Sequence, residues 1–63
     1  MKICYVIKSA FNDAYFKGDN TNWYWTAHIG GAKEFYSEGD ALALMSKLDQ
    51  GIRFNIVKIY GGL

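Results

Sequence analysis

The stretch SEGDALALMSKLDQG, residues 37–51, decides the fold because it is the chain's one clear helical pattern. Its apolar residues recur at spacings of three and four, which places them along one side of an α-helix. Ser37 suits the N-cap, with Asp40 three positions later and Glu38 beside the positive end of the helix dipole. Gly51 suits the C′ position, where a chain leaves a helix. The sequence therefore predicts a helix over about residues 38–50, with an apolar stripe of Ala41, Leu44, Met45 and Leu48 that Leu42 widens.

Segments with the composition of β-strands flank this helix. After it, residues 53–60 alternate in character and are predicted to form the last strand. Before it, residues 32–36 are predicted to be a short extended segment that leads into the helix. Gly30 and Gly31 precede that segment and favour a turn at the end of a strand, since a phosphate-binding loop needs more glycines and a helix directly after them.

The first half of the chain is predicted to hold three strands. Residues 2–8 carry apolar side chains on both faces, which is typical of a central strand. Turn-forming residues 9–13 follow, and residues 14–17 return as the second strand of a hairpin. The polar stretch 18–22 is a loop before the third strand, residues 23–29. Alternation sorts this third strand into two faces, Trp23, Trp25, Ala27 and Ile29 on one and Tyr24, Thr26 and His28 on the other.

These elements predict a single domain over residues 1–63 of the α+β class. Its order is strand, strand, strand, helix, strand, with an antiparallel sheet of three or four strands and one amphipathic helix packed on one face. One short helix covers only one face of such a sheet. Because the strands carry apolar side chains on both faces, the uncovered face is expected to be an interaction site.

Size and composition narrow the class of protein. A chain of 63 residues with 51% hydrophobic content must bury nearly all of those residues to be stable alone, so we expect a homodimer. A net charge of +1 indicates neither a polybasic arm nor an acidic mimic of nucleic acid. The single cysteine suits a reducing compartment. There is no signal-peptide pattern and no apolar run near the roughly 18 residues of a membrane helix, so we expect a cytoplasmic protein with no membrane partner.

Catalysis and metal binding receive little support from the residue types. A catalytic thiolate needs a base and an orienting group within hydrogen-bond reach, whereas Cys4 and His28 are single residues at unrelated positions. Their simpler interpretations are a small buried hydrophobe and a strand residue near the surface. A zinc site needs four ligands, more than one cysteine and one histidine supply. We therefore expect no enzyme, no metal and no cofactor.

Aromatic residues are the unusual feature of the composition. Four Phe, five Tyr and two Trp make up 17% of the chain, and none lies in the predicted helix. Alternation sends Tyr24 to the opposite face from Trp23 and Trp25, so one helix cannot bury all three. Either the tryptophans lie under the helix and Tyr24 covers the other face, or the cluster binds a partner. Because aromatic residues and arginine are common interface anchors, the predicted partner-binding residues are Trp23, Tyr24, Trp25, Tyr36, Arg53 and Tyr60.

The alternative function is a nucleic-acid-binding module that uses an aromatic and basic sheet face. Aromatic side chains on a sheet stack nucleobases in several single-strand binders. The near-zero net charge argues against this alternative, because affinity for nucleic acid comes largely from clustered cations. The cations that lie in or beside predicted strands are Lys2, Lys8, Lys17, Lys33, Arg53 and Lys58.

The strings YVIK (5–8), YFKG (15–18), AKEFYSEGDALALMSKL (32–48) and IVKIY (56–60), with a tryptophan-bearing strand among them, resemble small uncharacterised bacteriophage-encoded proteins. The resemblance covers most of the chain and implies a protein that binds a bacterial host protein and inhibits or redirects it, as inhibitors of host defence systems do. The chain resembles less closely the three-strand-plus-helix DNA-binding module of phage integrases, whose Arg-rich strands it lacks. The leading hypothesis is a non-catalytic, host-interacting phage protein in the host cytoplasm.

Overall fold

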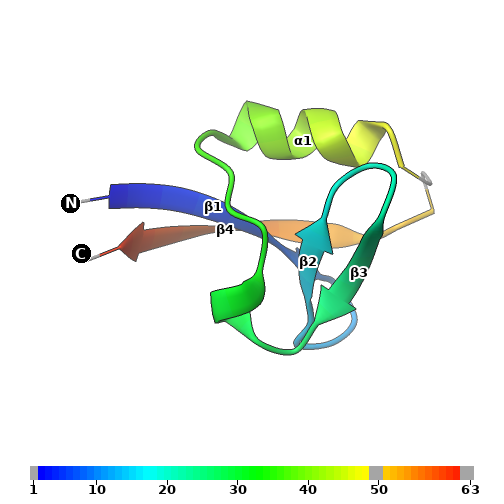
Figure 1. The fold of residues 1–63 in the computed structure, drawn as a ribbon, viewed down its shortest axis with the longest axis horizontal. Coiled ribbons are helices and arrows are strands. Elements are labelled where there is room, and N and C mark those ends of the chain that lie inside the picture. The colour runs from blue at the N-terminus through cyan, green and yellow to red at the C-terminus, as the bar shows by residue number, and fades with distance from the viewer. Residues whose placement is uncertain (1, 49–50, 62–63) are drawn as a thin grey trace.

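The computed structural model describes residues 2–48 and 51–61 and confirms the predicted α+β fold with its order of elements (Figure 1). The helix α1 spans Glu38–Ser46, and a short 3₁₀ helix, η1, spans Ile29–Gly31. The strands are β1 (Lys2–Ser9), β2 (Tyr15–Gly18), β3 (Trp23–Thr26) and β4 (Phe54–Gly61).

The four strands form one antiparallel sheet in the order β3-β2-β1-β4. β1 is therefore central, as its two apolar faces predict. It pairs with β4 along its whole length, from Lys2 opposite Gly61 to Ser9 opposite Phe54. With β2 it pairs only where Lys8 lies opposite Tyr15. In Figure 1, β1 and β4 form a long ribbon beneath α1, and the β2–β3 hairpin lies toward one end of it.

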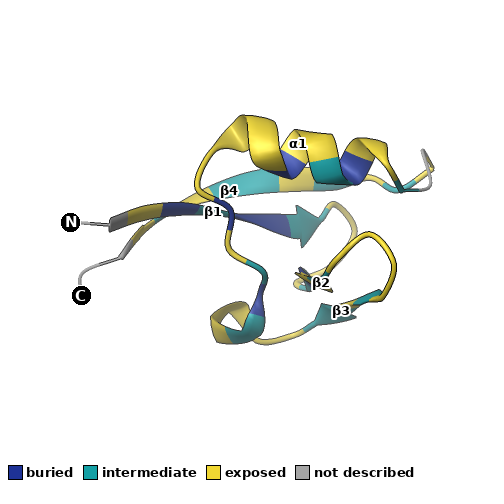
Figure 2. Ribbon diagram, turned by 45° about the horizontal axis from the view of Figure 1, so that its top comes forward, coloured by how far each residue is buried: buried dark blue, intermediate teal, exposed yellow. Residues whose placement is uncertain are grey.

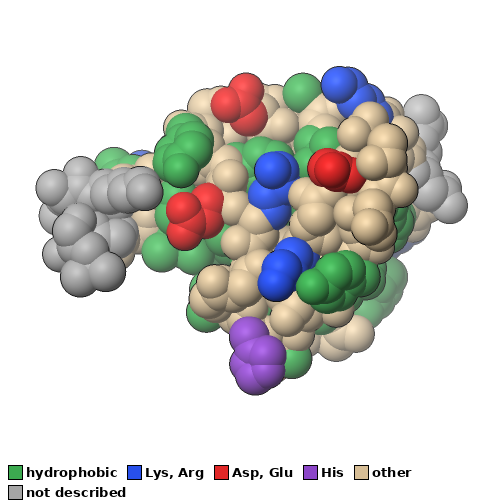
Figure 3. Space-filling view, in the orientation of Figure 1, with side chains coloured by type: hydrophobic (Ala, Val, Ile, Leu, Met, Phe, Trp, Pro, Cys, Tyr) green, Lys and Arg blue, Asp and Glu red, His purple; other side chains and the backbone are tan. Residues whose placement is uncertain are grey.

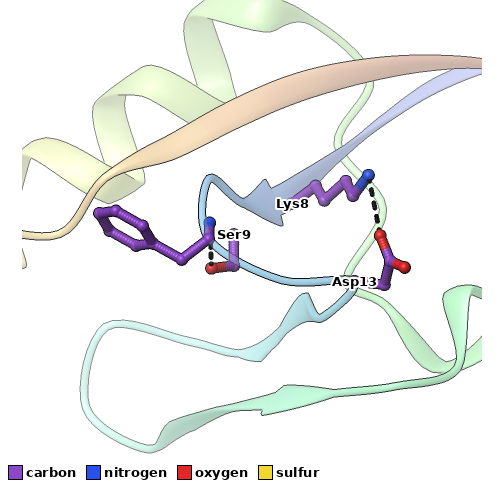
Figure 4. A network of polar contacts seen from close by, with 4 residues as sticks. Lys8, Ser9 and Asp13 are labelled. Atoms are coloured by element: carbon purple, nitrogen blue, oxygen red, sulfur yellow. Dashed lines mark hydrogen bonds and ion pairs between the residues drawn. The ribbon is translucent and has the colours of Figure 1, made fainter.

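Short-range polar contacts hold the turn between β1 and β2 (Figure 4). The Ser9 hydroxyl accepts the Phe11 amide at 3.2 Å, and the Ser9 amide donates to the Ala14 carbonyl at 2.8 Å. The Lys8 ammonium lies 3.3 Å from the carboxylate of Asp13, whose side chain is 93% exposed. Because so exposed an ion pair adds little stability, the turn depends mainly on its backbone hydrogen bonds.

The amino-terminal end of α1 is as predicted. The Ser37 hydroxyl accepts the Asp40 amide at 3.1 Å, which confirms the N-cap. The buried stripe is narrower than expected, because Ala41 and Met45 are buried while Leu42 is 51% exposed. Each residue of a helix is turned by about 100° from the one before it, so Leu42 lies beside the line of contact that Ala41 makes with the sheet.

The carboxyl-terminal end of α1 differs from the prediction. The helix stops at Ser46, four residues before the predicted end, and the last two predicted helical residues lie outside the described residues. The Ser46 hydroxyl donates to the Ala43 carbonyl at 2.8 Å, and the Lys47 amide bonds to the Leu44 carbonyl at 3.0 Å. A serine that bonds back in this way competes with the next backbone hydrogen bond of the helix. Gly51 is therefore too far along the chain to be the predicted C′ residue.

β3 is shorter than predicted. It ends at Thr26, whose hydroxyl accepts the His28 amide at 3.3 Å. The chain then turns through η1, where the Gly31 amide donates to the His28 carbonyl at 3.0 Å. The predicted continuation of the strand to Ile29 is wrong because these local hydrogen bonds replace pairing with β2. Ala27, His28 and Ile29 are all exposed, and His28 is not a strand residue.

Residues 32–36, the predicted extended segment, link β1 to the β2–β3 hairpin. Phe35 and Tyr5 exchange two backbone hydrogen bonds of 2.7 and 2.8 Å, on the edge of β1 that faces away from β4. The Lys33 amide donates to the Phe16 carbonyl of β2 at 2.9 Å. The segment therefore ties β1 to the hairpin just before α1 begins.

The core lies between α1 and the side of the sheet that faces it (Figure 2). Its buried centre is Ile7, Phe16, Phe35, Ala41 and Met45, and the half-buried residues packed around it are Tyr5, Trp23, Trp25, Leu44, Leu48, Ile52, Phe54 and Ile56. Cys4 and Val6, which alternate with Ile7 along β1 and so lie on the face away from α1, are also buried. The large hydrophobic residues that remain exposed are Ile3, Phe11, Tyr24, Ile29, Tyr36, Leu42 and Tyr60.

Candidate protein-binding surface

Pairing between β2 and β3 sorts the side chains of the hairpin onto two faces. The register sets Phe16 opposite Trp25 on the face that joins the core. It sets Lys17 opposite Tyr24 on the other face, because side chains alternate along a strand. The paired residues Tyr15 and Thr26 flank this pair at the base of the hairpin. We call the surface formed by Tyr15, Lys17, Tyr24 and Thr26 the hairpin face.

The two tryptophans pack behind the hairpin face. Trp23 stacks on Phe16 with ring centroids 5.4 Å apart, and Trp25 meets the same ring edge-on at 6.1 Å. The two indole rings are perpendicular to each other at 5.9 Å. Both tryptophans are half-buried, whereas Tyr24 points away from them. The predicted alternation is confirmed, and both tryptophans pack against the core cluster.

Tyr24 is the exposed centre of the hairpin face. It is 54% exposed, and the Lys17 ammonium lies 5.9 Å from the centroid of its ring. The same ammonium is 3.6 Å from the point where a Cβ on Gly31 would lie, so Lys17 also reaches η1. A lysine at this distance is attracted to the ring face by a cation–π interaction. Figure 3 shows basic side chains among hydrophobic ones on the face toward the viewer.

Asp19 holds the β2–β3 loop that joins the two strands of the hairpin face. Its carboxylate accepts the Thr21 amide at 2.9 Å, the Thr21 hydroxyl at 2.8 Å and the Asn22 amide at 2.9 Å. These hydrogen bonds, first that of the Thr21 amide, lower the pKa of Asp19 from its ordinary value, and the positive charge of Lys33 acts in the same direction. The loop is therefore shaped around an ionised carboxylate.

The hydrogen bonds of Asp19 predict that acid loosens the hairpin. Because the folded-state pKa lies below the unfolded value of about 3.9, the carboxylate contributes stability above that value and loses it as pH falls through the folded pKa. In an NMR titration, the Thr21 and Asn22 amide shifts are expected to move with a midpoint below about 3.9. The variant Asp19→Asn, which cannot ionise, should show no such transition. A midpoint at or above the ordinary value would contradict the geometry of the loop.

The other three predicted contact residues lie away from the hairpin face. Tyr36 is 65% exposed and stands between the Phe35 bridge and the start of α1. Arg53 is exposed directly before β4, and its carbonyl accepts the Ala10 amide at 3.1 Å. Tyr60 is 60% exposed near the far end of β4, with the Lys58 ammonium 5.4 Å from its ring centroid. The six predicted residues therefore do not form one surface.

The sequence analysis placed Thr26 on the same face as Tyr24 but missed Tyr15 and Lys17. These two residues lie opposite Thr26 and Tyr24 on β2, and their pairing depends on the register of two strands joined by a loop. Alternation within each strand was the available signal, since it places Tyr15 and Lys17 on one side of β2. Alternation alone does not give the length of the loop, and the loop length fixes which residues of the two strands lie opposite each other.

The described residues offer no metal centre, because residues 2–48 and 51–61 hold no group of three or more His, Cys, Asp and Glu side chains able to bind an ion. Cys4 is buried in β1, which confirms its interpretation as a small hydrophobe, whereas His28 is exposed beside η1. No helix in the described part of the chain is long and apolar enough to cross a membrane. Comparison with protein-family models, curated proteins and solved structures finds no match to this chain.

Proposed function

We propose that this chain is a non-catalytic protein-binding module and that Tyr24 on the hairpin face is its principal anchor. The observation that carries the proposal is an exposed aromatic ring, paired with Lys17, on the face of the hairpin turned away from the core. Tyrosine is one of the residue types enriched among the anchors of protein interfaces. The exposed position of Tyr24 therefore fits contact with a partner better than support of the fold.

The hairpin supports this role because its own internal packing is firm. Trp23 and Trp25 fill the space behind it, and the bonds of Asp19 fix the loop between its strands. An anchor that is already ordered loses little conformational entropy when it binds, so more of its contact energy appears as affinity. A tyrosine adds only two side-chain torsions to that cost.

The partner that we propose is a bacterial host protein, bound by a phage-encoded chain in the host cytoplasm. Support for this part comes from the resemblance of the sequence to small phage proteins that inhibit or redirect host proteins. A net charge of +1 is compatible with a protein partner, since no strong field of one sign repels it. Inhibition of a defence system is the outcome that the resemblance favours.

The variant Tyr24→Ala tests the anchor. A tagged chain is used to isolate a stoichiometric partner from bacterial lysate, and affinities of the purified pair are then measured by calorimetry. Loss of the ring is expected to weaken binding at least about tenfold, roughly 1.4 kcal/mol. The matched control is Phe11→Ala, which removes an aromatic ring that is 77% exposed in the β1–β2 turn. Equal affinities of the two variants, or no stoichiometric partner, would contradict the proposal.

The second candidate function is binding of single-stranded nucleic acid. It is favoured by two exposed tyrosines that each carry a lysine near the ring, Lys17 at Tyr24 and Lys58 at Tyr60. Such pairs resemble the stacking and charge contacts of single-strand binders. Binding of this kind weakens steeply as salt is raised. A labelled oligonucleotide that does not bind even at low salt would exclude this candidate.

A further inference from the structure

The outer edge of β4 is a long strand edge with little of the usual protection among the described residues. β4 lies at one end of the sheet and pairs with β1 from Phe54 to Gly61 without a bulge. The chain has no proline, and Lys58 is the one charged residue in the strand. Natural proteins normally protect such edges with proline, bulges, several charges or a covering segment, because an open edge is a template for another strand.

The hydrogen bonds of β1 show which residues of β4 point outward. The backbone of Tyr5 bonds to Phe35 and the amide of Ser9 bonds to Ala14, both on the β2 side of β1. The backbone amides and carbonyls of the residues that alternate with Tyr5 and Ser9 therefore point toward β4. The hydrogen bond from the Ala10 amide to the Arg53 carbonyl agrees with this alternation, because Ala10 also points toward the β4 side. On β4, the residues whose amides and carbonyls point away from β1 are therefore Phe54, Ile56, Lys58 and Tyr60.

These outward groups have no backbone partner within residues 2–48 and 51–61. The side chains of the same four residues lie on the helix side of the sheet, because Phe54 and Ile56 pack against the core. The outer edge of β4 therefore presents a row of backbone amides and carbonyls beside apolar side chains.

We infer that β4 pairs with β4 of a second copy of the chain, antiparallel and about a two-fold axis at Val57. Each outward residue then exchanges its amide and carbonyl with the residue opposite it. The two four-stranded sheets become one continuous sheet with a β4–β4 seam. Such an interface is isologous, since both copies contribute the same surface.

Symmetry and charge select this register. Only the even-numbered residues of β4 have backbone amides and carbonyls that point outward. They must therefore pair with even-numbered residues of the second copy. An axis at Lys58 would set two ammonium groups directly opposite each other, which is unfavourable. An axis at Ile56 would pair only residues 54–58 of the strand. The axis at Val57 pairs residues 54–60 and moves each lysine opposite an isoleucine.

The side chains also match in this register. Tyr60, which is 60% exposed, lies opposite Phe54 of the second copy, and symmetry repeats this aromatic pair on the other side of the axis. The two Val57 side chains meet on the face away from α1, because Val57 alternates with the core residue Ile56 along the strand. Pairing in this register thus covers Tyr60, one of the large apolar side chains that a single chain leaves exposed.

Self-association of this kind leaves the hairpin face free. The sheet order places β3 at the edge farthest from β4, so Tyr24 lies remote from the seam. The inference is therefore independent of the proposed function, and either one can fail while the other holds.

The variant Lys58→Pro tests the seam through the backbone. It removes an outward amide and no hydrogen bond to β1, and proline is tolerated on a strand edge in that orientation. The wild-type chain is expected to show twice its mass of 7.1 kDa by sedimentation or light scattering. Lys58→Pro should show the single mass with its far-UV spectrum retained. The control Lys58→Ala removes the charge, keeps the amide and should remain a dimer.

Cysteine crosslinking tests the register without relying on proline. In a Cys4→Ala background, Val57→Cys places two thiols at a non-hydrogen-bonded pair, where Cα atoms about 4.5 Å apart suit a disulfide. Mild oxidation should crosslink most of the chains. The matched variant Asn55→Cys should not crosslink, because Asn55 lies opposite Ile59 and its own copy is about 13 Å along the strand.

Any one of four results would overturn the inference. One is a wild-type monomer up to high micromolar concentration, and another is a dimer that Lys58→Pro leaves intact. The third is a dimer in which Asn55→Cys crosslinks and Val57→Cys does not. Hydrogen exchange of the Ile56, Lys58 and Tyr60 amides adds a direct measure, since the dimer should protect them more as concentration rises. Independence of their exchange from concentration would also count against the seam.

Discussion

Replacing Phe16 with alanine is expected to lower the free energy of unfolding by about 3–5 kcal/mol, enough to leave the chain largely unfolded. Phe16 is the largest fully buried side chain among the described residues. Its ring stacks with Trp23, meets Trp25 edge-on and packs in the same cluster as Ile7. Alanine would remove contacts with all of these at once and leave a cavity that the paired strands cannot close.

Urea unfolding followed by tryptophan fluorescence and circular dichroism measures the effect of Phe16→Ala. The matched control is Phe11→Ala, because that ring is 77% exposed in a turn and its loss should change stability by less than about 0.5 kcal/mol. A Phe16→Ala chain that loses less than about 1 kcal/mol would show that the hairpin does not depend on this side chain.

Replacing Gly18 with alanine is expected to have the second largest effect. Gly18 has φ of 112°, a conformation that a side chain rarely adopts. A Cβ at this position would also meet the Asn22 carbonyl oxygen and would lie 2.8 Å from the Cα of Trp23. The backbone strain alone corresponds to roughly 1–3 kcal/mol, and the clash adds to it. The loop must therefore change shape, which disturbs the pairing of β2 with β3.

Gly30→Ala is the matched control for Gly18→Ala. No atom lies within 4 Å of a Cβ built on Gly30, and its backbone does not have positive φ. Alanine there should be neutral or should stabilise the chain by up to about 1 kcal/mol through the unfolded state. The comparison uses the same unfolding experiment, with the Thr21 and Asn22 amides as a local readout of the loop. Equal stability of the two variants would contradict the structure of the β2–β3 loop.

Local signals in the sequence predicted a large part of this fold. The N-cap at Ser37, the central position of β1 and the opposite faces of Tyr24 and Trp25 each depend on a few neighbouring residues. Rules of capping and alternation act at that range, so they succeeded. The fold class followed because the elements and their order were correct.

The element ends were less predictable because competing side-chain bonds decide them. α1 ends where the Ser46 hydroxyl donates to the Ala43 carbonyl, and β3 ends where the Thr26 hydroxyl accepts the His28 amide. Each bond is one of several that serine or threonine can make. Hydrophobic periodicity continues past both points and does not reveal which bond forms.

The candidate surfaces depend on pairing between distant parts of the chain. The identity of β4 as an edge strand follows from its pairing with β1, at the opposite end of the sequence. The hairpin face likewise requires the register that sets Lys17 opposite Tyr24. Sequence patterns favoured aromatic residues as contacts, but they did not show that Trp23 and Trp25 pack toward the core while Tyr24 faces out.

The narrow junction between β1 and β2 has a mechanical consequence. The hairpin joins the β1–β4 ribbon through the single pair of Lys8 with Tyr15, the Ser9 to Ala14 bond and the tie from Lys33 to Phe16. Next to these contacts, the Phe16 ring is buried in the core. The attachment of the hairpin to the ribbon therefore depends more on the buried side chain of Phe16 than on strand pairing.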